Sequence, residues 1–373
     1  MTRTWVVTVA AAAAAVVALN AGSRAARQAS GRPAEPQIAW IVQPSGTDAD
    51  LRGVSAVDAH TCWASGSKGT VVRTIDGGQT WQTLTIPGTE TAGFRDIEAF
   101  DKDTAIAISI AGPARFFKTT DGGKAWTEVY HNDAKGIFFD AFAFADARTG
   151  FGFGDPVDGR FFVINTQDGG NSWQEVPKDG MPQMVPDEKA FAASGSCLTM
   201  RGKQNVWFVT GGSTAARVFR STNGGKTWEA IDSQLSAGIT TSGGFSLIFL
   251  NDRNGIVVGG NHKDENWTEK NAATTSDGGR TWKLVETRKP SGFREGVAAV
   301  PGSRPLLIVT VGLNGSDYSL DLGRSWTPIS SASKGFHGVS FAKDGTGWAV
   351  GRNGLIARYS TTPPTARTSP GQR

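Results

Sequence analysis

Cysteine, histidine, methionine and tyrosine are scarce in this sequence: its 373 residues include 2 Cys, 4 His, 4 Met and 3 Tyr. The histidines and cysteines are scattered and lack the short, regular spacings of a metal site, so no metal is expected. The sequence also has no G-x-G-x-x-G opening a helix, no phosphate-binding loop and no G-x-S-x-G elbow. These absences argue against a nucleotide cofactor, or any other cofactor, and against serine-hydrolase chemistry.

A strong excess of one charge is also missing. The formal net charge is +4, but Arg3, Arg24 and Arg27 lie in the first 30 residues, which contain no acid, so the remainder carries about +1. A chain that is nearly neutral lacks the broad basic surface of a nucleic-acid-binding protein. Hydrophobic residues make up 39% of the chain, enough for a core but too few for a protein that spans the membrane many times.

The one long apolar run lies at the N-terminus. Arg3 precedes an alanine-rich stretch over residues 5–21, followed by small residues, which is the pattern of an export signal. Cleavage near Ala21 or Ala25 and retention as a membrane anchor are both open. Residues 1–30 are therefore expected to be a signal peptide or anchor with a linker, and the protein to be exported to the periplasm or the cell exterior.

Glycine and tryptophan are abundant, with 48 Gly and 12 Trp, and much of both falls in one repeated motif. Six copies of a Ser/Thr-x-Asp/Asn-x-Gly-x-x-Trp turn occur, and their tryptophans are 45, 47, 55, 54 and 44 residues apart. The third residue can accept hydrogen bonds from the amides of its own turn, and glycine supplies positive φ. Because these residues recur around the repeat, we expect a structural rather than a catalytic role for Asp76, Asp121, Asp168, Asn223, Asp277 and Asp321.

Each motif lies within a unit of four short strands. In the first unit the expected strands are residues 51–57, 61–67, 70–75 and 80–86. About 45 residues for four strands fits one blade of a β-propeller. Cys62 and Cys197 fall in blades one and four, too far apart for a disulfide, so we expect two unpaired thiols.

The seventh unit supplies only three strands, over residues 336–360. Residues 38–43 offer the fourth, with Trp40 where the other blades have the motif tryptophan, and this pairing would close the ring. The sequence therefore predicts an all-β, seven-bladed β-propeller of four-stranded blades over residues 36–360. Residues 361–373, with three prolines, are expected to be a disordered tail.

The six motifs place the chain close to the BNR or Asp-box repeat family. Segments such as GDPVDGRFFVINTQDGG (residues 154–170) and NAATTSDGGRTW (residues 271–282) resemble bacterial relatives of the photosystem II stability/assembly factor family. That resemblance implies a seven-bladed propeller that binds a membrane-protein assembly intermediate without catalysis. We therefore expect a non-catalytic scaffold, a monomer with a protein partner and no nucleic acid.

A positive rim is the expected partner-binding surface. The second residue of the first strand is expected to be Arg52, Arg95, Arg294 and His337 in blades one, two, six and seven, all at one face of the ring. The loops between strands two and three should add further cations there. The alternative is that these side chains pair with nearby acids, such as Arg160 with Asp158. The loop cations are Lys68, Arg115, Arg160, Arg217, Lys270 and Arg352.

Two long loops are further candidates. Residues 259–273 carry Trp267, read as an exposed contact residue, with a plain solvated loop or a weak metal site at His262 as alternatives. In residues 177–189, two methionines could either contact a partner or cover the end of the core.

Glycoside hydrolysis is the alternative function, because Asp-box propellers also include sialidases and glucan hydrolases. None of the three tyrosines begins an inner strand, where a sialidase-like nucleophile is expected. The inner-strand acids Asp96, Asp140 and Glu295 were the only candidates for the required carboxylate pair, and they share one expected strand position.

Overall fold

The computed structural model describes residues 36–110, 113–330 and 334–361. The described residues from Ile38 onward belong to one compact unit. The predicted export segment lies outside the described residues, as does the predicted tail except for Thr361. No helix in the described ranges is long and apolar enough to span a membrane.

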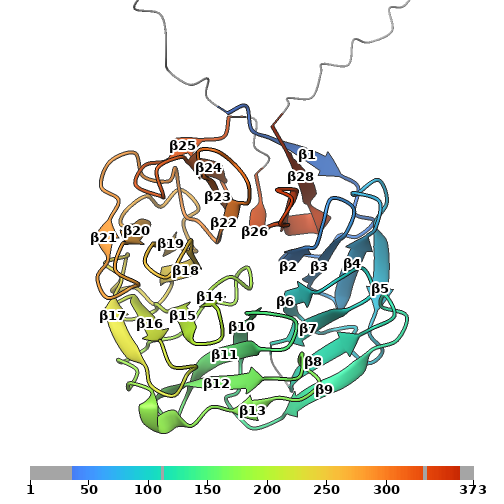
Figure 1. Ribbon diagram of the computed structural model, residues 1–373, viewed down its shortest axis with the longest axis horizontal. Helices are drawn as coiled ribbons and strands as arrows, with labels where there is room; N and C mark the ends of the chain where they lie inside the picture. Colours follow the sequence, from blue (N-terminus) through green and yellow to red (C-terminus); the bar gives the residue numbers. More distant parts are fainter. Residues whose placement is uncertain (1–35, 111–112, 331–333, 362–373) are drawn as a thin grey trace, which may run out of the picture. The chain divides into compact units, whose positions relative to one another are not determined.

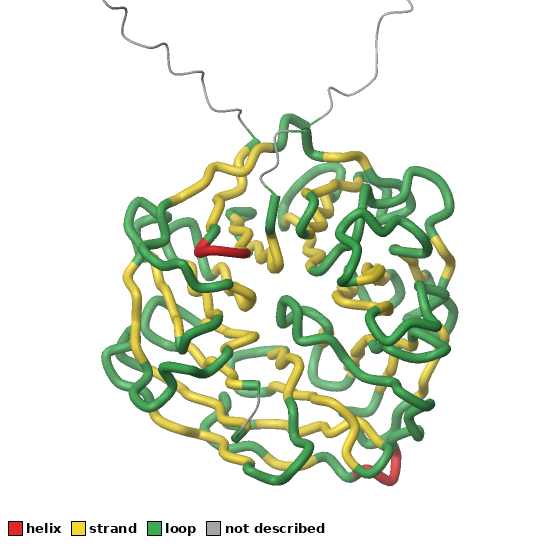
Figure 2. Tube along the Cα trace, turned by 180° about the vertical axis from the view of Figure 1, so that it is seen from behind, coloured by secondary structure: helices red, strands yellow, loops and turns green. Residues whose placement is uncertain are grey.

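The compact unit consists of seven four-stranded antiparallel sheets that follow one another in a ring (Figures 1 and 2). This confirms the predicted all-β, seven-bladed propeller. Within each of the first six blades, consecutive strands pair from the inside of the ring outward.
The strands of blades one to three are β2 (Leu51–Ala56), β3 (Cys62–Gly66), β4 (Thr70–Thr74), β5 (Gln82–Thr85), β6 (Phe94–Ala99), β7 (Ala105–Ser109), β8 (Ala114–Thr119), β9 (Thr127–Asn132), β10 (Phe139–Phe144), β11 (Gly150–Val157), β12 (Arg160–Thr166) and β13 (Gln174–Glu175).

Blades four to six repeat this order, and in blade seven the outer strand is β1. Two 3-10 turns, η1 (Lys178–Gly180) and η2 (Arg352–Gly354), are the helical elements of the described residues.
The strands of blades four to seven are β14 (Leu198–Arg201), β15 (Asn205–Val209), β16 (Arg217–Ser221), β17 (Glu229–Asp232), β18 (Ser242–Phe249), β19 (Gly255–Asn261), β20 (Ala272–Thr275), β21 (Lys283–Leu284), β22 (Gly296–Val300), β23 (Leu307–Gly312), β24 (Gly315–Ser319), β25 (Thr327–Pro328), β26 (Phe336–Phe341), β27 (Gly347–Gly351), β28 (Ile356–Ser360) and β1 (Ala39–Gln43).

Strand β1 closes the ring as the outer strand of blade seven, as predicted. Trp40 pairs with Tyr359, and Ile41 with Arg358, the register at which Gln82 pairs with Arg73 in blade one. Trp40 therefore takes the place of the motif tryptophan. The adjoining Gln43 ties blade seven to blade one: its amide donates to the Gly77 carbonyl at 3.1 Å and its Oε1 accepts from the Trp348 indole at 3.1 Å.

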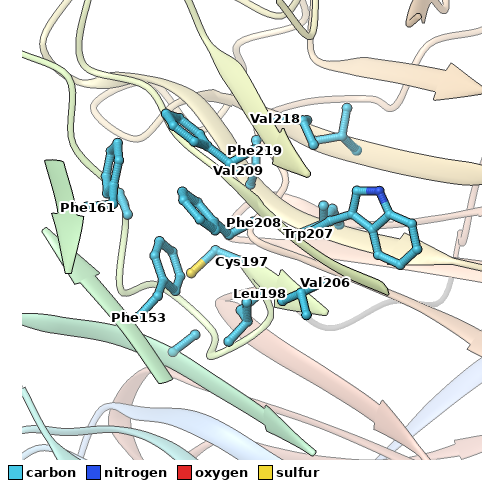
Figure 3. Packing of buried hydrophobic residues seen from close by; sticks show 14 of the residues in the cluster. Phe153, Phe161, Cys197, Leu198, Val206, Trp207, Phe208, Val209, Val218 and Phe219 are labelled. Atoms are coloured by element: carbon cyan, nitrogen blue, oxygen red, sulfur yellow. The ribbon is translucent and has the colours of Figure 1, made fainter. Parts of the chain in front are cut away.

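The core lies between the faces of neighbouring sheets. Middle strands such as β3, β7 and β27 are buried along their whole length, because a blade covers each side, whereas the outer β5 buries one residue in four. Figure 3 shows the core around blade four, where Phe208 stacks on Phe153 of blade three at 4.5 Å and on Phe219 at 4.6 Å. Such aromatic layers hold adjacent blades in register.

The two cysteines lie in this core as unpaired thiols. Cys62 is on β3 of blade one and Cys197 immediately precedes β14 of blade four, and both are fully buried. Burial raises the pKa of both thiols well above the ordinary value. Buried, protonated thiols are unreactive, so these residues act as small core side chains.

The six repeated turns share one hydrogen-bond pattern. In blade three, the Thr166 hydroxyl donates to Asp168 Oδ1 at 2.8 Å and accepts from the Gly170 amide at 2.9 Å. Asp168 also accepts from the Ser172 amide at 3.0 Å and from its hydroxyl at 2.7 Å. The aspartate thus satisfies the turn's own donors, as expected for a structural residue.

Blade four carries the one amide in this set. Asn223 accepts from the Thr227 amide at 3.0 Å through Oδ1, and its Nδ2 donates to the Thr227 hydroxyl at 2.8 Å. The hydroxyl of Thr227 thus accepts a hydrogen bond, whereas the corresponding hydroxyl of Ser172 in blade three donates one. The turn of blade four therefore keeps the same shape without a group that titrates.

Because Asn223 does not titrate, the turn of blade four should lose less stability in acid than the turns that contain aspartate. Hydrogen bonds from the Thr80 hydroxyl and amide lower the pKa of Asp76 to about 2, and the pKa values of Asp168 and Asp277 are also about 2. A lowered pKa stabilises the fold fully above the ordinary value near pH 4, and this contribution is lost as the pH falls toward about 2. We expect Asn223→Asp to steepen the fall in melting temperature between pH 4 and pH 2, and Asp168→Asn to flatten it. Identical pH profiles for both variants would contradict this assignment.

Candidate functional site

The inner strands carry a repeated β-bulge at the end from which they start. In β2, β6, β10, β18 and β26 the register skips one residue, so two residues face one residue of the next strand. A bulge redirects the side chain of the extra residue. In blade six the Glu295 amide donates to the Val311 carbonyl at 2.9 Å while Gly296 pairs with Val311, so Glu295 takes the same position.
The bulge residues are Arg52, Arg95, Asp140, Phe245, Glu295 and His337.

All six bulge residues line one cavity of about 470 Å³, here called the central cavity. Blade four contributes no bulge residue. Its inner strand β14 begins at Leu198, and the preceding segment, residues 189–193, lines the cavity instead. Figure 1 shows the connection before β14 reaching toward the middle of the ring. The cavity is therefore lined by the inner strands of six blades and by the loop that precedes the inner strand of blade four.

Contacts with the bulge residues hold this segment in place. Phe191 stacks on Phe245 with ring centroids 4.1 Å apart. Arg52 Nη1 donates to the Ala193 carbonyl at 3.2 Å, and Arg95 Nη1 donates to the Ala192 carbonyl at 3.4 Å. Each arginine thus donates one hydrogen bond to the loop backbone, and this bond orients its guanidinium in the cavity wall.

Positive charge predominates around the central cavity. Burial, and then the nearby charge of Arg52, lower the pKa of Arg95 to about 10, so Arg95 remains charged at neutral pH. Arg52 lies 3.6 Å from Glu295, but within the described residues Arg95 makes no ion pair. Lys189, Lys263 and Arg352 line the same cavity. Five cationic side chains therefore face three carboxylates, which favours an anionic ligand group.

The three acids that line the cavity are unequally paired. Glu295 Oε2 lies 2.8 Å from His337 Nδ1. Asp155 accepts from the Ala190 amide at 3.0 Å. Asp140 is fully buried, and neither of its carboxylate oxygens has a hydrogen-bond partner among the described residues. Burial, and then the charge of Asp155, raise the pKa of Asp140 well above its ordinary value, while Arg95 acts in the opposite direction.

The predicted positive rim is only partly formed. Arg52 and Arg95 lie together at the cavity, and His337 joins them, although it is buried. Arg294 does not reach the central cavity, because it is fully buried and pairs with Asp317. Arg294 precedes the bulge residue of blade six, and a shift of one residue along a strand turns the side chain to the other face.

Of the predicted loop cations, Arg352 lines the central cavity, whereas Arg115, Arg160 and Arg217 lie away from it and have partners of their own. Arg217 pairs with the buried Glu188, Nε to Oε1 at 2.9 Å. Arg115 lies 3.5 Å from Glu128. Arg160 donates to the Met181 carbonyl at 2.9 Å, so the suggested pairing with Asp158 does not form. Met181 itself is buried in the core, which favours the covering role for its loop.

Trp267 differs from the exposed contact residue that the sequence suggested. It is half-buried against Phe245 and Phe293, and its indole nitrogen donates to Ser236 Oγ at 2.9 Å and to the Glu269 carbonyl at 2.8 Å. Trp267 therefore anchors its loop. No cluster of three or more metal-ligating side chains occurs within the described residues, and His262 lines the central cavity instead.

The three acids considered for hydrolysis do not share one position. Asp140 and Glu295 are bulge residues at the central cavity, whereas Asp96 follows the bulge of blade two. Asp96 accepts hydrogen bonds from the amides of Ile97 and Phe142, at 2.8 and 3.0 Å. It therefore links the inner strands of blades two and three. The cavity residues that the sequence analysis missed include Asp155, Lys189, Phe245 and Lys263.

The fold and its six turns define a seven-bladed propeller of BNR/Asp-box repeats. The family described as "Photosynthesis system II assembly factor YCF48" matches residues 33–136, and the BNR/Asp-box repeat matches residues 219–230. The chain is thus a BNR-repeat propeller that resembles this photosystem II assembly factor. A sequence comparison with curated proteins found no match.

Solved structures share the fold. "YCF48 bound to D1 peptide" has a TM-score of 0.61 at 20% identity, covering 88% of this chain and 98% of that one. YCF48 from Cyanidioschyzon merolae has a TM-score of 0.60 at 15% identity, with 86% and 98% covered. The GH74 enzyme from Niastella koreensis has a TM-score of 0.61 at 15% identity, but only 54% of that chain is covered. At these identities the likeness concerns the fold alone.

Proposed function

We propose that this protein is an exported, non-catalytic scaffold that binds a segment of a partner protein at the central cavity, through Arg52 and Arg95. The observation that carries the proposal is the placement of two charged guanidinium groups on adjacent blades at one cavity, with no carboxylate paired to Arg95 among the described residues. Guanidinium groups recognise carboxylates through paired, charge-assisted hydrogen bonds. An acidic stretch of a partner is the group that fits them.

The surroundings of the cavity suit an extended segment. A wider groove of about 1110 Å³, lined in part by residues 42–48 and 352–355, adjoins the cavity, and Arg352 lines both. A chain leaving the cavity would run along this groove between the β1–β2 connection and blade seven. The likeness to YCF48, whose structure is known with a D1 peptide, supports a protein partner.

Crosslinking in cells followed by purification of the tagged protein tests this function. We expect the wild type to recover a partner and Arg52→Gln/Arg95→Gln to lose most of it, because truncating a buried charged contact typically costs ~2–5 kcal/mol of binding. Arg52→Glu/Arg95→Glu should lose it entirely. Melting curves of the purified variants establish that they are folded.

The matched control is Lys124→Glu/Lys226→Glu, which makes the same charge reversal at exposed positions in the Asp-box turns. It should recover the partner as the wild type does. Equal recovery by the Gln double variant and the wild type would overturn the proposed site. The alternative, glycoside hydrolysis by Asp140 and Glu295, predicts release of reducing sugar by the purified protein, and we expect none because Glu295 is held by His337 and Arg52.

A further inference from the structure

Two side chains of the central cavity have buried polar atoms without a hydrogen-bond partner in the part of the chain that the structure describes. These atoms are both carboxylate oxygens of Asp140 and Nε2 of His337, and the two residues are 0% and 2% exposed. Buried polar groups in folded proteins are almost always hydrogen-bonded, and the exceptions concentrate where a ligand or water completes the pattern. Both residues are bulge residues of the same cavity, in blades three and seven. The unmet bonding capacity therefore belongs to one site.

The neighbours of Asp140 are already engaged elsewhere. Arg95 is close enough to act on its charge, but the Arg95 guanidinium donates to the Ala192 carbonyl. Asp155 is an acceptor like Asp140 and takes the Ala190 amide. On either side of Asp140 along β10, Phe139 and Ala141 are fully buried in the core. The described residues thus place a carboxylate at the cavity wall and supply no hydrogen-bond donor for it.

The chemistry of these groups defines the missing one. Burial raises the pKa of Asp140, so its carboxylate form needs a cationic donor beside it to be stable. That carboxylate only accepts hydrogen bonds, and a neutral His337 that donates from Nδ1 to Glu295 presents Nε2 as a second acceptor. The missing group must therefore donate. An ammonium supplies three hydrogen-bond donors together with the positive charge that stabilises a buried carboxylate. The arginine pair on the neighbouring blades would repel an isolated cation, so the ammonium must come with an anion of its own.

We propose that the central cavity binds an ammonium group carried close to a carboxylate, with Asp140 accepting from the ammonium and Arg52 and Arg95 donating to the carboxylate. The carboxylate half rests on the proposed function, and the ammonium half is new. A cavity of about 470 Å³ is large enough for such a ligand. This pair of groups occurs in a free amino acid and in neighbouring acidic and basic side chains of a protein segment.

Calorimetric titration of the full-length protein at neutral pH separates the two halves and the two sources. The probes are L-glutamine, a glutamyl-lysine dipeptide capped at both ends, acetate and methylammonium. We expect one or both of the first two to bind more tightly than acetate or methylammonium. Binding of glutamine alone identifies a free amino acid, and binding of the capped dipeptide alone identifies a protein segment.

Asp140→Asn should weaken the ammonium-bearing probe about tenfold, the loss expected for one hydrogen bond to a charged group, and should leave the affinity for acetate within about twofold. An Asn side chain can still accept a hydrogen bond from the ammonium, so Asp140→Ala is the second variant, and it should show at least the same tenfold loss. Asp133→Asn, at an exposed position before β10, is the matched control and should bind as the wild type does. Binding of the ammonium-bearing probes unchanged in both Asp140 variants, or absent in the wild type, would overturn the proposal.

The two proposals fail separately. Loss of the Asp140 effect, with partner recovery still dependent on Arg52 and Arg95, would remove the ammonium site and leave the scaffold function. Partner recovery that is independent of the arginines, with the Asp140 effect intact, would instead leave a small-ligand site in a protein whose partner binds elsewhere.

Discussion

Replacing Arg294 with methionine is expected to lower the free energy of unfolding by ~3–5 kcal/mol, the usual cost of leaving one charge of a buried pair alone. Arg294 and Asp317 are both fully buried. The guanidinium donates to Asp317 Oδ2 at 2.7 Å, to Asn314 Oδ1 at 2.6 Å and to Ser291 Oγ at 2.7 Å. It thereby joins the loops at one end of blade six. Urea denaturation monitored by tryptophan fluorescence provides the measurement.

A second substitution tests the cause. Arg294→Met/Asp317→Leu removes both charges, so it should recover most of the stability lost by Arg294→Met. Arg324→Met, at an exposed position of the same blade, should change the unfolding free energy by no more than ~0.5 kcal/mol. An unfolding midpoint for Arg294→Met equal to that of the wild type would refute the structural role. The result also matters for binding studies, since reversing the charge of Arg294 would abolish partner recovery by unfolding the blade.

Replacing Trp40 with alanine should lower the free energy of unfolding by ~3–5 kcal/mol, because a buried indole leaves a large cavity. Trp40 is 5% exposed and packs on Phe336 at 5.4 Å and on Tyr359 at 6.0 Å. It belongs to the strand that completes blade seven, so its loss weakens the closure of the whole ring. The same denaturation measurement applies.

The control lies on the same strand. Val42 is 55% exposed, so Val42→Ala should cost well under ~1 kcal/mol. Deleting residues 36–43 should be more severe than Trp40→Ala, because it also removes the Gln43 bonds to blade one. Adding those residues back as a peptide should restore part of the stability. Equal effects of Trp40→Ala and Val42→Ala would show that the closing strand is not held by its tryptophan.

The architecture could be predicted from the sequence because the turn motif recurs in six of the seven blades. The turn motif fixes the place of strands three and four, and its period counts the blades. The closing strand is predicted from the missing fourth strand of blade seven together with Trp40, and the register confirms that this residue replaces a motif tryptophan. These are local patterns that survive without knowledge of the tertiary contacts.

The cavity was harder to predict because a bulge shifts the strand by one residue. Phe293-Arg294 looks like Phe94-Arg95, yet Arg294 is buried and Glu295 faces the cavity. A signal was present in the glycine that follows the bulge in blades one, six and seven. A Cβ at Gly53 would lie 2.6 Å from Ser65 Oγ, and one at Gly338 2.5 Å from the Arg52 carbonyl, so side chains are excluded there. Aligning Gly296 with these two would have placed Glu295 in the bulge.

The loop before β14 could not be positioned by such patterns. Its residues 189–193 are held by a stacked ring, two arginines and a neighbouring carboxylate, all from distant parts of the chain. The contacts with Arg52 and Arg95 reach blades one and two, so they exist only once the ring has formed. The pairing of Arg217 with Glu188 lies within blade four, but Glu188 belongs to the same irregular segment, so the strand pattern does not predict it either.

The closing strand also sets an order of events during synthesis. Strand β1 is among the first made, yet its partner β28 follows about 300 residues later along the chain. Until then both edges of the growing array of blades stay open, and the central cavity lacks His337. A chain that stops before β26 therefore has neither a closed ring nor the complete lining of the central cavity.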